Sequence, residues 1–358
     1  MKVLEVCAYA APYEGNFMQS LFALEHRLSL KGIETIYAFP EKAAEIPWCQ
    51  KLAYRAKVYF LPLYRAQFQM KTYRMLRDIY RENPDIGVVH SHFEQYDTPV
   101  ELTAPGNVRV FWHLHDPIKR TRDLKGFLMK LKYRFIGRRA YLISVAEKYR
   151  RDMIALGFAE DRSETVLNGI CLDRVRDNRP DGRKRQYDFL TFGWNFDQKG
   201  DDIAIKACDR IYGEGYRFRF LLNGLDVTWN AIDAFCHGVS PDYLVKGAPV
   251  NDINVPFSES ALFVSASRRE TFSYAIAEAA YAGLPVISSD IPGVEWAHDL
   301  PTVFFFESEN DAALADLLRS FLNGRTLSDE DIDKTRRVIE EKYSVSSWVD
   351  RIEALYGV

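Results

Sequence analysis

The sequence has no long hydrophobic run and few cysteines. Among its 358 residues, no stretch approaches the roughly 20 consecutive apolar residues that span a bilayer. The opening segment carries Glu5 inside what would be the apolar core of a signal peptide. The 5 cysteines are scattered without a C-x-x-C pair, which argues against a zinc knuckle or a disulfide framework. We therefore expect a cytoplasmic protein that folds from its first residues, which form a strand.

The composition is that of a globular protein, but its charge is uneven. Hydrophobic residues make up 47% and charged residues 27% of a chain that is long enough for two domains. Residues 1–170 contain 26 Lys and Arg against 19 Asp and Glu, whereas the remainder contains 21 against 31. The two parts therefore carry net charges of +7 and -10, which together give the formal charge of -3. This division indicates that the N-terminal half faces an anionic partner.

Short apolar runs alternate with segments of helical period, which is typical of parallel sheets covered by helices. Two series of strands are predicted, at residues 3–7, 34–38, 86–90, 108–112 and 141–145, and at 187–192, 218–222, 261–264 and 284–287. The charge-dense stretch 171–186 separates them as a linker. We predict an N-terminal Rossmann-like domain over residues 1–168 and a C-terminal one over 169–342. An amphipathic helix within 343–358 is expected to pack back on the first domain.

The most informative segment is residues 267–290, SRRETFSYAIAEAAYAGLPVISSD. Its pattern predicts a loop that holds Glu270 and a helix from Phe272 to Ala282. The first amides of such a helix have no internal partners and lie at its positive end, where a diphosphate can bind. Glu278 follows two turns along the same helix. Taken alone, two glutamates at this spacing are also typical of a solvated helix face.

This segment resembles the E-x7-E motif of retaining glycosyltransferases of family 4, usually written E-G-F-G-x-x-x-x-E-A-x-A-x-G-x-P-V-I-x-x-D. The matching residues are Glu270, Phe272, Glu278, Ala279, Ala282, Gly283, Pro285, Val286, Ile287 and Asp290. The resemblance implies an α/β protein of GT-B fold, in which two Rossmann-like domains face each other with a cleft between them. It also implies an enzyme that transfers a sugar from a nucleoside-diphosphate-sugar to a hydroxyl acceptor with retention of configuration.

The resemblance assigns roles to the residues of this segment. In the family, the first glutamate contacts hydroxyls of the donor sugar and the second holds the ribose, and these positions are Glu270 and Glu278 here. The amides at the helix start would hold the diphosphate, at Thr271, Phe272, Ser273 and Tyr274. Thr271 and Ser273 stand where the family has glycines. This difference predicts a tighter loop, whose amides point in other directions than those of the family's loop.

A second match lies at residues 192–200, FGWNFDQKG, which is similar to the family's G-R-x4-K-G loop. The match places Gly193 at the donor and Lys199 at its diphosphate. A fixed cation there stabilises the charge that develops on the leaving nucleoside diphosphate. The alternative interpretation is an exposed lysine that caps a turn.

The family's arginine in this loop is Trp194 here, so one of two phosphate cations is missing. Arg268 or Arg269, beside Glu270, is the candidate substitute. We include Arg268 among the predicted donor-binding residues.

The N-terminal half matches the family less closely. Gly15, followed by Asn16 where the family has a second glycine, can let a backbone amide approach phosphate or sugar, although a purely structural turn is equally compatible. His115 resembles the H-D end of a central strand and is predicted to contact the donor sugar or the reacting centre. His90 and His92 match a V-H-x-H strand end. We interpret these two as cleft-lining or structural, because no carboxylate or cysteine completes a metal-binding set.

Residues 117–139 contain nine lysines and arginines opposed by Asp123 alone, interleaved with apolar side chains. A basic helix with an apolar side can lie in an anionic membrane interface, where each cation contributes about 1 kcal/mol. Packing of that apolar side on the domain is equally compatible. The membrane interpretation fits a lipid-linked acceptor and a peripheral location on the inner face of the membrane. Nucleic acid is not an expected partner, because the sequence has no recognition module and a slightly negative net charge.

The resemblance also has implications for cofactors, substrates and pathway, and two alternative functions stay open. It implies no metal or cofactor, a UDP- or GDP-sugar as co-substrate, and a glycan or lipid-linked saccharide as acceptor, in polysaccharide or glycolipid synthesis. One alternative is a sugar-nucleotide epimerase of GT-B fold, which would need acid and base residues that the sequence does not identify. The other is a partner subunit that binds a sugar nucleotide without transferring the sugar, for which Trp194 is the indication.

Overall fold

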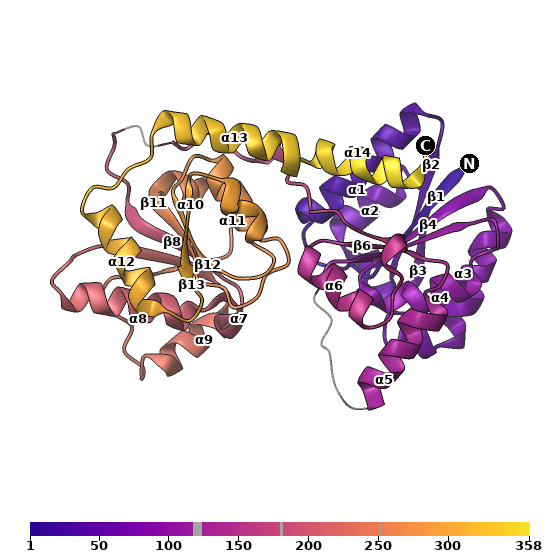
Figure 1. Ribbon diagram of the computed structural model, residues 1–358, viewed down its shortest axis with the longest axis horizontal. Helices are drawn as coiled ribbons and strands as arrows, with labels where there is room; N and C mark the ends of the chain where they lie inside the picture. The colour runs from indigo at the N-terminus through magenta and orange to yellow at the C-terminus, as the bar shows by residue number, and fades with distance from the viewer. Residues whose placement is uncertain (117–123, 180–181, 251) are drawn as a thin grey trace. The chain divides into compact units, whose positions relative to one another are not determined.

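The computed structural model describes residues 1–116, 124–179, 182–250 and 252–358 (Figure 1). The chain forms two compact units. One consists of Met1–Gly169 together with Val345–Val358, and the other of Ile170–Ser344. Each unit is a parallel sheet covered by helices, so the predicted α/β fold with two Rossmann-like domains is confirmed.

The first unit is built on a seven-stranded parallel sheet in the order β3-β2-β1-β4-β5-β6-β7. Its strands are β1 Lys2–Cys7, β2 Glu34–Pro40, β3 Val58–Leu61, β4 Ile86–His92, β5 Arg109–Leu114, β6 Tyr141–Ser144 and β7 Ser163–Thr165. Its helices are α1 Gly15–Leu30, α2 Pro47–Ala53, α3 Met70–Glu82, α4 Asp97–Thr103, α5 Leu124–Leu131, α6 Glu147–Ala155 and α14 Val345–Tyr356. The central strands are buried on both faces, which explains their continuous apolar runs.

The second unit has a six-stranded parallel sheet in the order β10-β9-β8-β11-β12-β13. Its strands are β8 Tyr187–Gly193, β9 Phe220–Gly224, β10 Leu244–Gly247, β11 Ser260–Ser265, β12 Val286–Asp290 and β13 Val303–Glu307. Its helices are α7 Phe196–Lys199, α8 Asp201–Gly213, α9 Asp226–Phe235, α10 Asn254–Glu259, α11 Tyr274–Tyr281, α12 Asp311–Leu322 and α13 Asp329–Tyr343. The strand order reverses between β8 and β11, and ligands of open α/β sheets bind at the carboxyl ends of such neighbouring strands.

The C-terminal helix α14 packs on the first unit, beside α1 (Figure 1). Trp348, Ile352 and Tyr356 are buried within the same hydrophobic cluster as residues of β1 and α1. Three ion pairs join the two helices: Arg27–Asp350 at 2.9 Å, Arg27–Glu353 at 3.2 Å and Lys31–Glu353 at 3.1 Å. Among the described helices, none combines the length and the hydropathy that a membrane span requires.

Candidate donor site

Both motifs of the C-terminal unit lie at the carboxyl ends of its two central strands. The loop with Lys199 follows β8, and the loop with Glu270 follows β11. Because β8 and β11 are adjacent, the two loops meet at the point where the strand order reverses. The backbone amide of Arg268 donates to the carbonyl of Gln198 at 2.8 Å and joins them.

Lys199 and Glu270 are in direct contact. The Lys199 Nζ lies 2.6 Å from Glu270 Oε1, and the Ser267 hydroxyl donates to the same oxygen at 2.8 Å. The Glu270 side chain is only 9% exposed and that of Lys199 22% exposed. This lysine is therefore not a solvated turn residue, and its charge is held at the predicted sugar and diphosphate site.

Helix α11 begins at Tyr274, two residues after the predicted start. Ser273 has a φ of 60°, in the left-handed region that favours glycine, which agrees with the glycine found at this position in the family. The Phe272 ring stacks on Trp296 with centroids 4.6 Å apart, and the Phe272 carbonyl accepts from Trp296 Nε1 at 2.7 Å. The side chain of Phe272 is thus part of the core. Thr271 and Tyr274, which are partly exposed, remain the more accessible of the four predicted diphosphate residues.

Glu278 lies on α11 among Ala277, Ala279 and Ala280, and it is 5% exposed. Its carboxylate therefore does not belong to a solvated helix face, so this alternative interpretation of the glutamate pair does not hold for Glu278.

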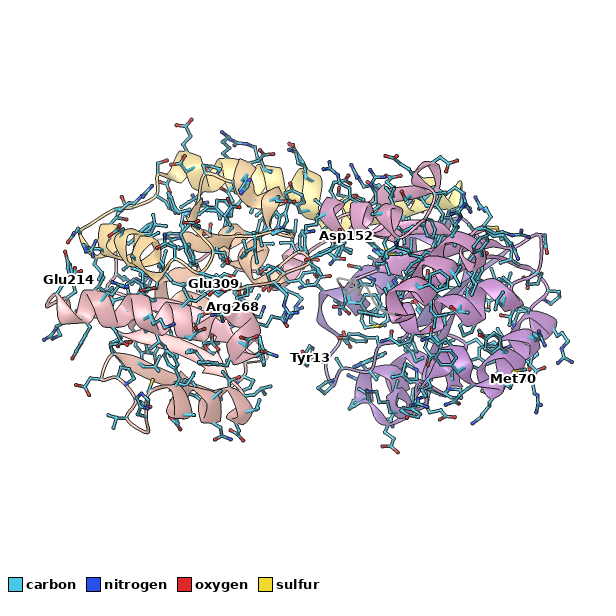
Figure 2. All side chains as sticks on the ribbon, turned by 60° about the horizontal axis from the view of Figure 1, so that its bottom comes forward. Tyr13, Met70, Asp152, Glu214, Arg268 and Glu309 are labelled. Carbon is cyan, nitrogen blue, oxygen red and sulfur yellow. The ribbon has the colours of Figure 1, made fainter. Side chains whose placement is uncertain are left out.

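The two arginines beside Glu270 differ in their surroundings. Arg268 forms paired hydrogen bonds with Asp202, at 2.8 and 2.9 Å, and with Glu309, at 2.6 and 3.1 Å. Figure 2 labels Arg268 and Glu309 next to each other on the second unit. Hydrogen bonds to Asp202 and Glu309 raise the pKa of Arg268. Arg269 is exposed and forms no ion pair with the residues that the structure describes. The geometry therefore favours Arg269 over Arg268 as the second phosphate cation.

The structure adds Asp201 and a cavity, which the sequence reasoning missed. Asp201 is 1% exposed, and neither of its carboxylate oxygens has a hydrogen-bond partner among the described residues. A Cβ at Gly193 would lie 2.8 Å from Asp201 Oδ2, so an alanine there would force the Asp201 carboxylate to move. Burial raises the pKa of Asp201 to about 7. The only sequence signal is the pair of acidic residues, Asp201 and Asp202, that directly follows the K-G pair.

A cavity of about 410 Å³ lies at the carboxyl ends of β9 and β10, on the same edge of the sheet as Lys199. It is lined by Gly224, Leu225, Asp226, Trp229 and the segment 246–249. The Trp229 ring lies 5.1 Å from Lys246 Nζ. An aromatic wall beside backbone groups can hold a planar base.

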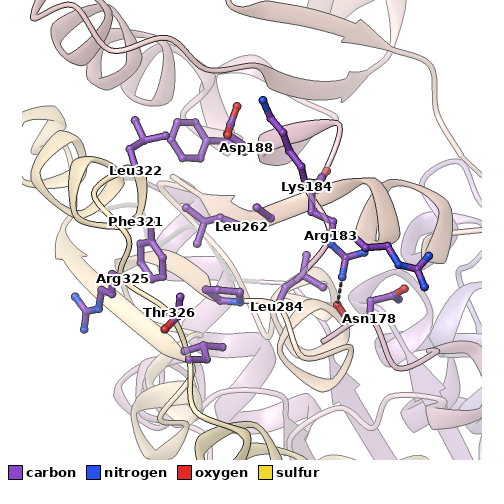
Figure 3. A pocket seen from close by; sticks show the side chains of 16 residues that line it. Asn178, Arg183, Lys184, Asp188, Leu262, Leu284, Phe321, Leu322, Arg325 and Thr326 are labelled. Carbon is purple, nitrogen blue, oxygen red and sulfur yellow. Dashed lines mark hydrogen bonds between the residues drawn. The ribbon is translucent and has the colours of Figure 1, made fainter. Parts of the chain in front are cut away.

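Another cavity, of about 290 Å³, lies at the opposite edge of this sheet (Figure 3). Its walls include Phe189, Leu262 and Leu284, at or just before the amino ends of β8, β11 and β12. None of the predicted donor residues lines it. It is therefore not the candidate donor site.

In the first unit, Gly15 and His115 lie near the carboxyl ends of β1 and β5. Gly15 opens α1 with a φ of 59°. His115 directly follows β5, is 8% exposed, and burial lowers its pKa to about 3. It is therefore a neutral imidazole at physiological pH.

The prediction that no carboxylate lies beside the strand-end histidines is wrong. Glu5, on β1, is 1% exposed, and its Oε2 lies 2.8 Å from His92 Nε2. His90, His92 and His113 also bring potential metal-binding atoms within 4.8 Å of one another. The sequence could not show this, because 87 residues separate Glu5 from His92.

Burial of Glu5 predicts a pH-dependent stability. Burial raises its pKa from 4.5 to about 8, so the folded state binds a proton that the unfolded state has already lost. Stability therefore falls as pH rises from 4.5 through 8. Between pH 6.5 and 9 this group should cost about 2 kcal/mol of unfolding free energy. Urea unfolding of wild type at both pH values measures the loss.

The Glu5→Gln variant should lose about 2 kcal/mol less than wild type over this pH interval. Glu25→Gln is the matched control, since Glu25 contacts Tyr37 and Arg55 outside the histidine group. An equal loss in wild type and Glu5→Gln would contradict the assignment.

Two family models match the chain. The model described as Glycosyltransferase Family 4 matches residues 21–174, and the model described as Glycosyl transferases group 1 matches residues 187–324. No curated protein matches the sequence.

Solved structures share the fold at low sequence identity. A glycosyltransferase from Rickettsia africae is 15% identical with a TM-score of 0.77, over 99% of this chain and 97% of that one. HepE of Anabaena, in complex with UDP, is 14% identical with a TM-score of 0.80 over 100% of both chains. WaaG, a glycosyltransferase involved in lipopolysaccharide biosynthesis, is 14% identical with a TM-score of 0.70, over 99% of this chain and 100% of that one. These structures show that the chain has the GT-B fold, and the two family matches show that it belongs to the glycosyltransferases, with a family 4 N-terminal domain and a group 1 C-terminal domain.

Proposed function

We propose that the protein transfers a sugar from a nucleoside-diphosphate-sugar to a hydroxyl acceptor with retention of configuration. The contact between Lys199 Nζ and Glu270 Oε1 at 2.6 Å is the observation that carries this proposal. The cation and the carboxylate lie at the carboxyl ends of the adjacent parallel strands β8 and β11, and Glu270 shortly precedes the start of α11. A leaving diphosphate needs the cation, and sugar hydroxyls need the carboxylate as an acceptor.

In this scheme Glu278 holds the ribose, and the cavity beside Trp229 holds the base. The two lie on the same unit, and the diphosphate spans the helix start between sugar and nucleoside. HepE, which shares the fold, was solved with UDP and with UDP-glucose. We therefore propose a UDP-sugar as donor. The leaving phosphate oxygen takes the acceptor's proton, so no side chain acts as a base and no metal is required.

Thermal unfolding in the presence of UDP, UDP-sugars and GDP tests the donor proposal. A ligand at 100 times its Kd stabilises the native state by about 2.7 kcal/mol, which raises the Tm by about 5–10 °C. UDP should do so, and Glu278→Ala should reduce the shift. Product analysis with donor alone separates transfer from epimerisation. A protein that no nucleotide stabilises would contradict the proposal.

Removal of the two arginine side chains should have different effects. Arg269→Ala is expected to weaken UDP binding about tenfold, because it removes an unpaired cation beside the diphosphate. Arg268→Ala should chiefly lower stability, because it leaves Asp202 and Glu309 without their partner. Calorimetric titration with UDP, alongside urea unfolding, checks both. Equal UDP affinity in wild type and Arg269→Ala would contradict this assignment.

We also propose that the first unit binds an anionic membrane surface through α5 and the short π-helix Lys132–Ile136 that follows it. Residues 117–123 of the predicted basic segment lie outside the described part of the chain. Within the described part, four large apolar side chains are exposed, namely Phe127, Leu128, Leu131 and Phe135. Lys130, Arg134 and Arg138 are exposed among them. Two cations of the predicted face have structural partners instead: Lys132 pairs with Glu94, and Arg139 donates to three backbone carbonyls.

Sedimentation with vesicles that contain phosphatidylglycerol tests the membrane proposal. Wild type should bind at low salt, and the double variant Phe127→Ser, Phe135→Ser should bind at least about tenfold more weakly, since each ring contributes hydrophobic burial. Phe68→Ser is the control, because Phe68 is an exposed phenylalanine of the same unit outside this face. Failure of wild type to bind would contradict the proposal.

A further inference from the structure

Six buried polar side chains form one hydrogen-bonded group on the α1 and α14 side of the first sheet. They are Glu5 on β1, His90 and His92 on β4, His113 on β5, His115 just after it, and Tyr356 on α14. Alternate residues of a strand point to the same face, and Glu5 pairs with His90 and His92 with His113 in the sheet register. Each of the six is less than one-tenth exposed.

In the branch formed by Tyr356, His90 and His113, the hydrogen bonds determine which atom carries each proton. The Tyr356 hydroxyl donates to Glu5 Oε1 at 3.0 Å. His90 Nδ1 lies 2.6 Å from the same hydroxyl oxygen, so it must donate to it. A neutral imidazole carries one N–H, so His90 Nε2 accepts, and His113 Nδ1 at 3.2 Å donates to it.

The other branch has two consistent arrangements. His92 Nε2 lies 2.8 Å from Glu5 Oε2, and His92 Nδ1 lies 3.1 Å from His115 Nε2. If Glu5 is protonated, it donates to His92 Nε2, and His92 Nδ1 donates to His115 Nε2. The proton of His115 then resides on Nδ1. If Glu5 is ionised, both bonds reverse, and the His115 proton resides on Nε2.

We propose that Glu5 and His92 are positioning residues that fix which ring nitrogen of His115 carries its proton. This rests on the proposed function and on the prediction from the sequence that His115 contacts the donor sugar. With Glu5 protonated, His115 Nδ1 is a hydrogen-bond donor, and with Glu5 ionised it is an acceptor. The protonation state of Glu5 thus decides whether His115 Nδ1 donates a hydrogen bond to a sugar oxygen or accepts one from a sugar hydroxyl.

At neutral pH the donor form prevails. Burial raises the pKa of Glu5 to about 8 and lowers the pKa of His92 well below its usual range. The other titratable groups that face Glu5 are uncharged as well, because burial lowers the pKa of the histidines and raises that of the phenols and the thiol: His90 on β4, Tyr356 on α14, Tyr37 on β2 and Cys7 on β1. Glu5 is therefore the group that changes charge.

The same geometry argues against a metal ion among these histidines. Both ring nitrogens of His90 and of His92 are already hydrogen-bonded, as is His113 Nδ1. Among the described residues, His113 Nε2 is the ring nitrogen of this group that lies buried without a partner. A metal ion held by His90, His92 and His113 would have to break at least two of these bonds, one at His90 and one at His92, to gain its ligands.

Nitrogen-15 NMR of histidine-labelled protein tests the proposal without any substrate. His115 and His92 should carry their protons on Nδ1 at pH 6.5 and on Nε2 at pH 9.5. Glu5→Gln should keep both on Nδ1 at both pH values, because the amide oxygen accepts from Tyr356 and the amide nitrogen faces His92. Glu25→Gln should behave like wild type. A tautomer that ignores pH or Glu5→Gln, or stoichiometric Zn²⁺ binding that shifts all three histidines His90, His92 and His113, would overturn the proposal.

A transfer assay separates this proposal from the proposed function. Wild-type kcat should fall about tenfold by pH 9, whereas kcat of Glu5→Gln should not change between pH 7 and 9, with KM for the donor unchanged in both. If the tautomers respond as expected but no sugar nucleotide is turned over, the proposed function fails and the positioning role stands. If transfer occurs while the His115 tautomer ignores Glu5, the positioning role alone fails.

Discussion

Lys199→Ala should lower kcat for sugar transfer by about 100- to 1,000-fold, which is the usual cost of removing one fixed electrostatic group from a transition state. The Lys199 ammonium lies 2.6 Å from Glu270, at the edge where the diphosphate is proposed to leave. Negative charge on that diphosphate grows as the glycosidic bond breaks. The loss should therefore appear mainly in kcat, with a smaller change in KM for the donor, and steady-state assays with a UDP-sugar measure both.

Lys206→Ala is the matched control for this prediction. Lys206 is an exposed lysine of the adjacent helix α8 and lies 3.6 Å from Asp202. Its removal should change kcat less than twofold. The melting temperatures of both variants show whether either effect comes from unfolding. A Lys199→Ala enzyme that keeps more than a tenth of wild-type kcat would refute the assigned role.

Gly200→Ala should destabilise the second unit by about 2–5 kcal/mol. Gly200 has a φ of 65°, and a Cβ there would lie 2.0 Å from the carbonyl oxygen of Ala266. A left-handed backbone costs an alanine about 1–2 kcal/mol, and overpacking adds about 1–3 kcal/mol. The contacting atom is backbone, so the substitution must also separate the loops that carry Lys199 and Glu270. The free energy of unfolding measured in urea and the affinity for UDP should both decrease.

Gly213→Ala, at the far end of the helix α8 that Gly200 precedes, is the control, because no atom lies within 4 Å of the position that its Cβ would take. That change should be neutral or stabilising by up to about 1 kcal/mol. If Gly200→Ala and Gly213→Ala had equal unfolding free energies, the close contact of the two loops would be disproved.

Hydrophobic patterning predicted the central strands but not the outer ones. The predicted segments correspond to β1, β2, β4, β5 and β6 in the first unit and to β8, β9, β11 and β12 in the second. The sequence reasoning missed β3, β7, β10 and β13. These are the edge strands of the two sheets; they are three to five residues long and partly exposed. β7 and β10 lack the continuous apolar run of a buried strand, whereas β3 and β13 have short apolar runs that the sequence prediction overlooked.

For the candidate site, local motifs identified the residues and tertiary structure decided their partners. Lys199 and Glu270 stand out in the sequence, yet their contact across 71 residues depends on β8 lying beside β11. The pairing of Arg268 with Glu309 likewise requires two segments that are distant in the chain to meet.

The sequence by itself determined two α/β domains and a donor motif, because hydrophobic periodicity and helix-start chemistry are local properties. Only the tertiary structure decided that Glu5 accompanies His92 and that Tyr356 completes the group from 351 residues away. Such contacts follow from strand order and from the docking of α14, which no local pattern encodes. A buried carboxyl acquires its pKa and its partners only once the sheet has closed around it.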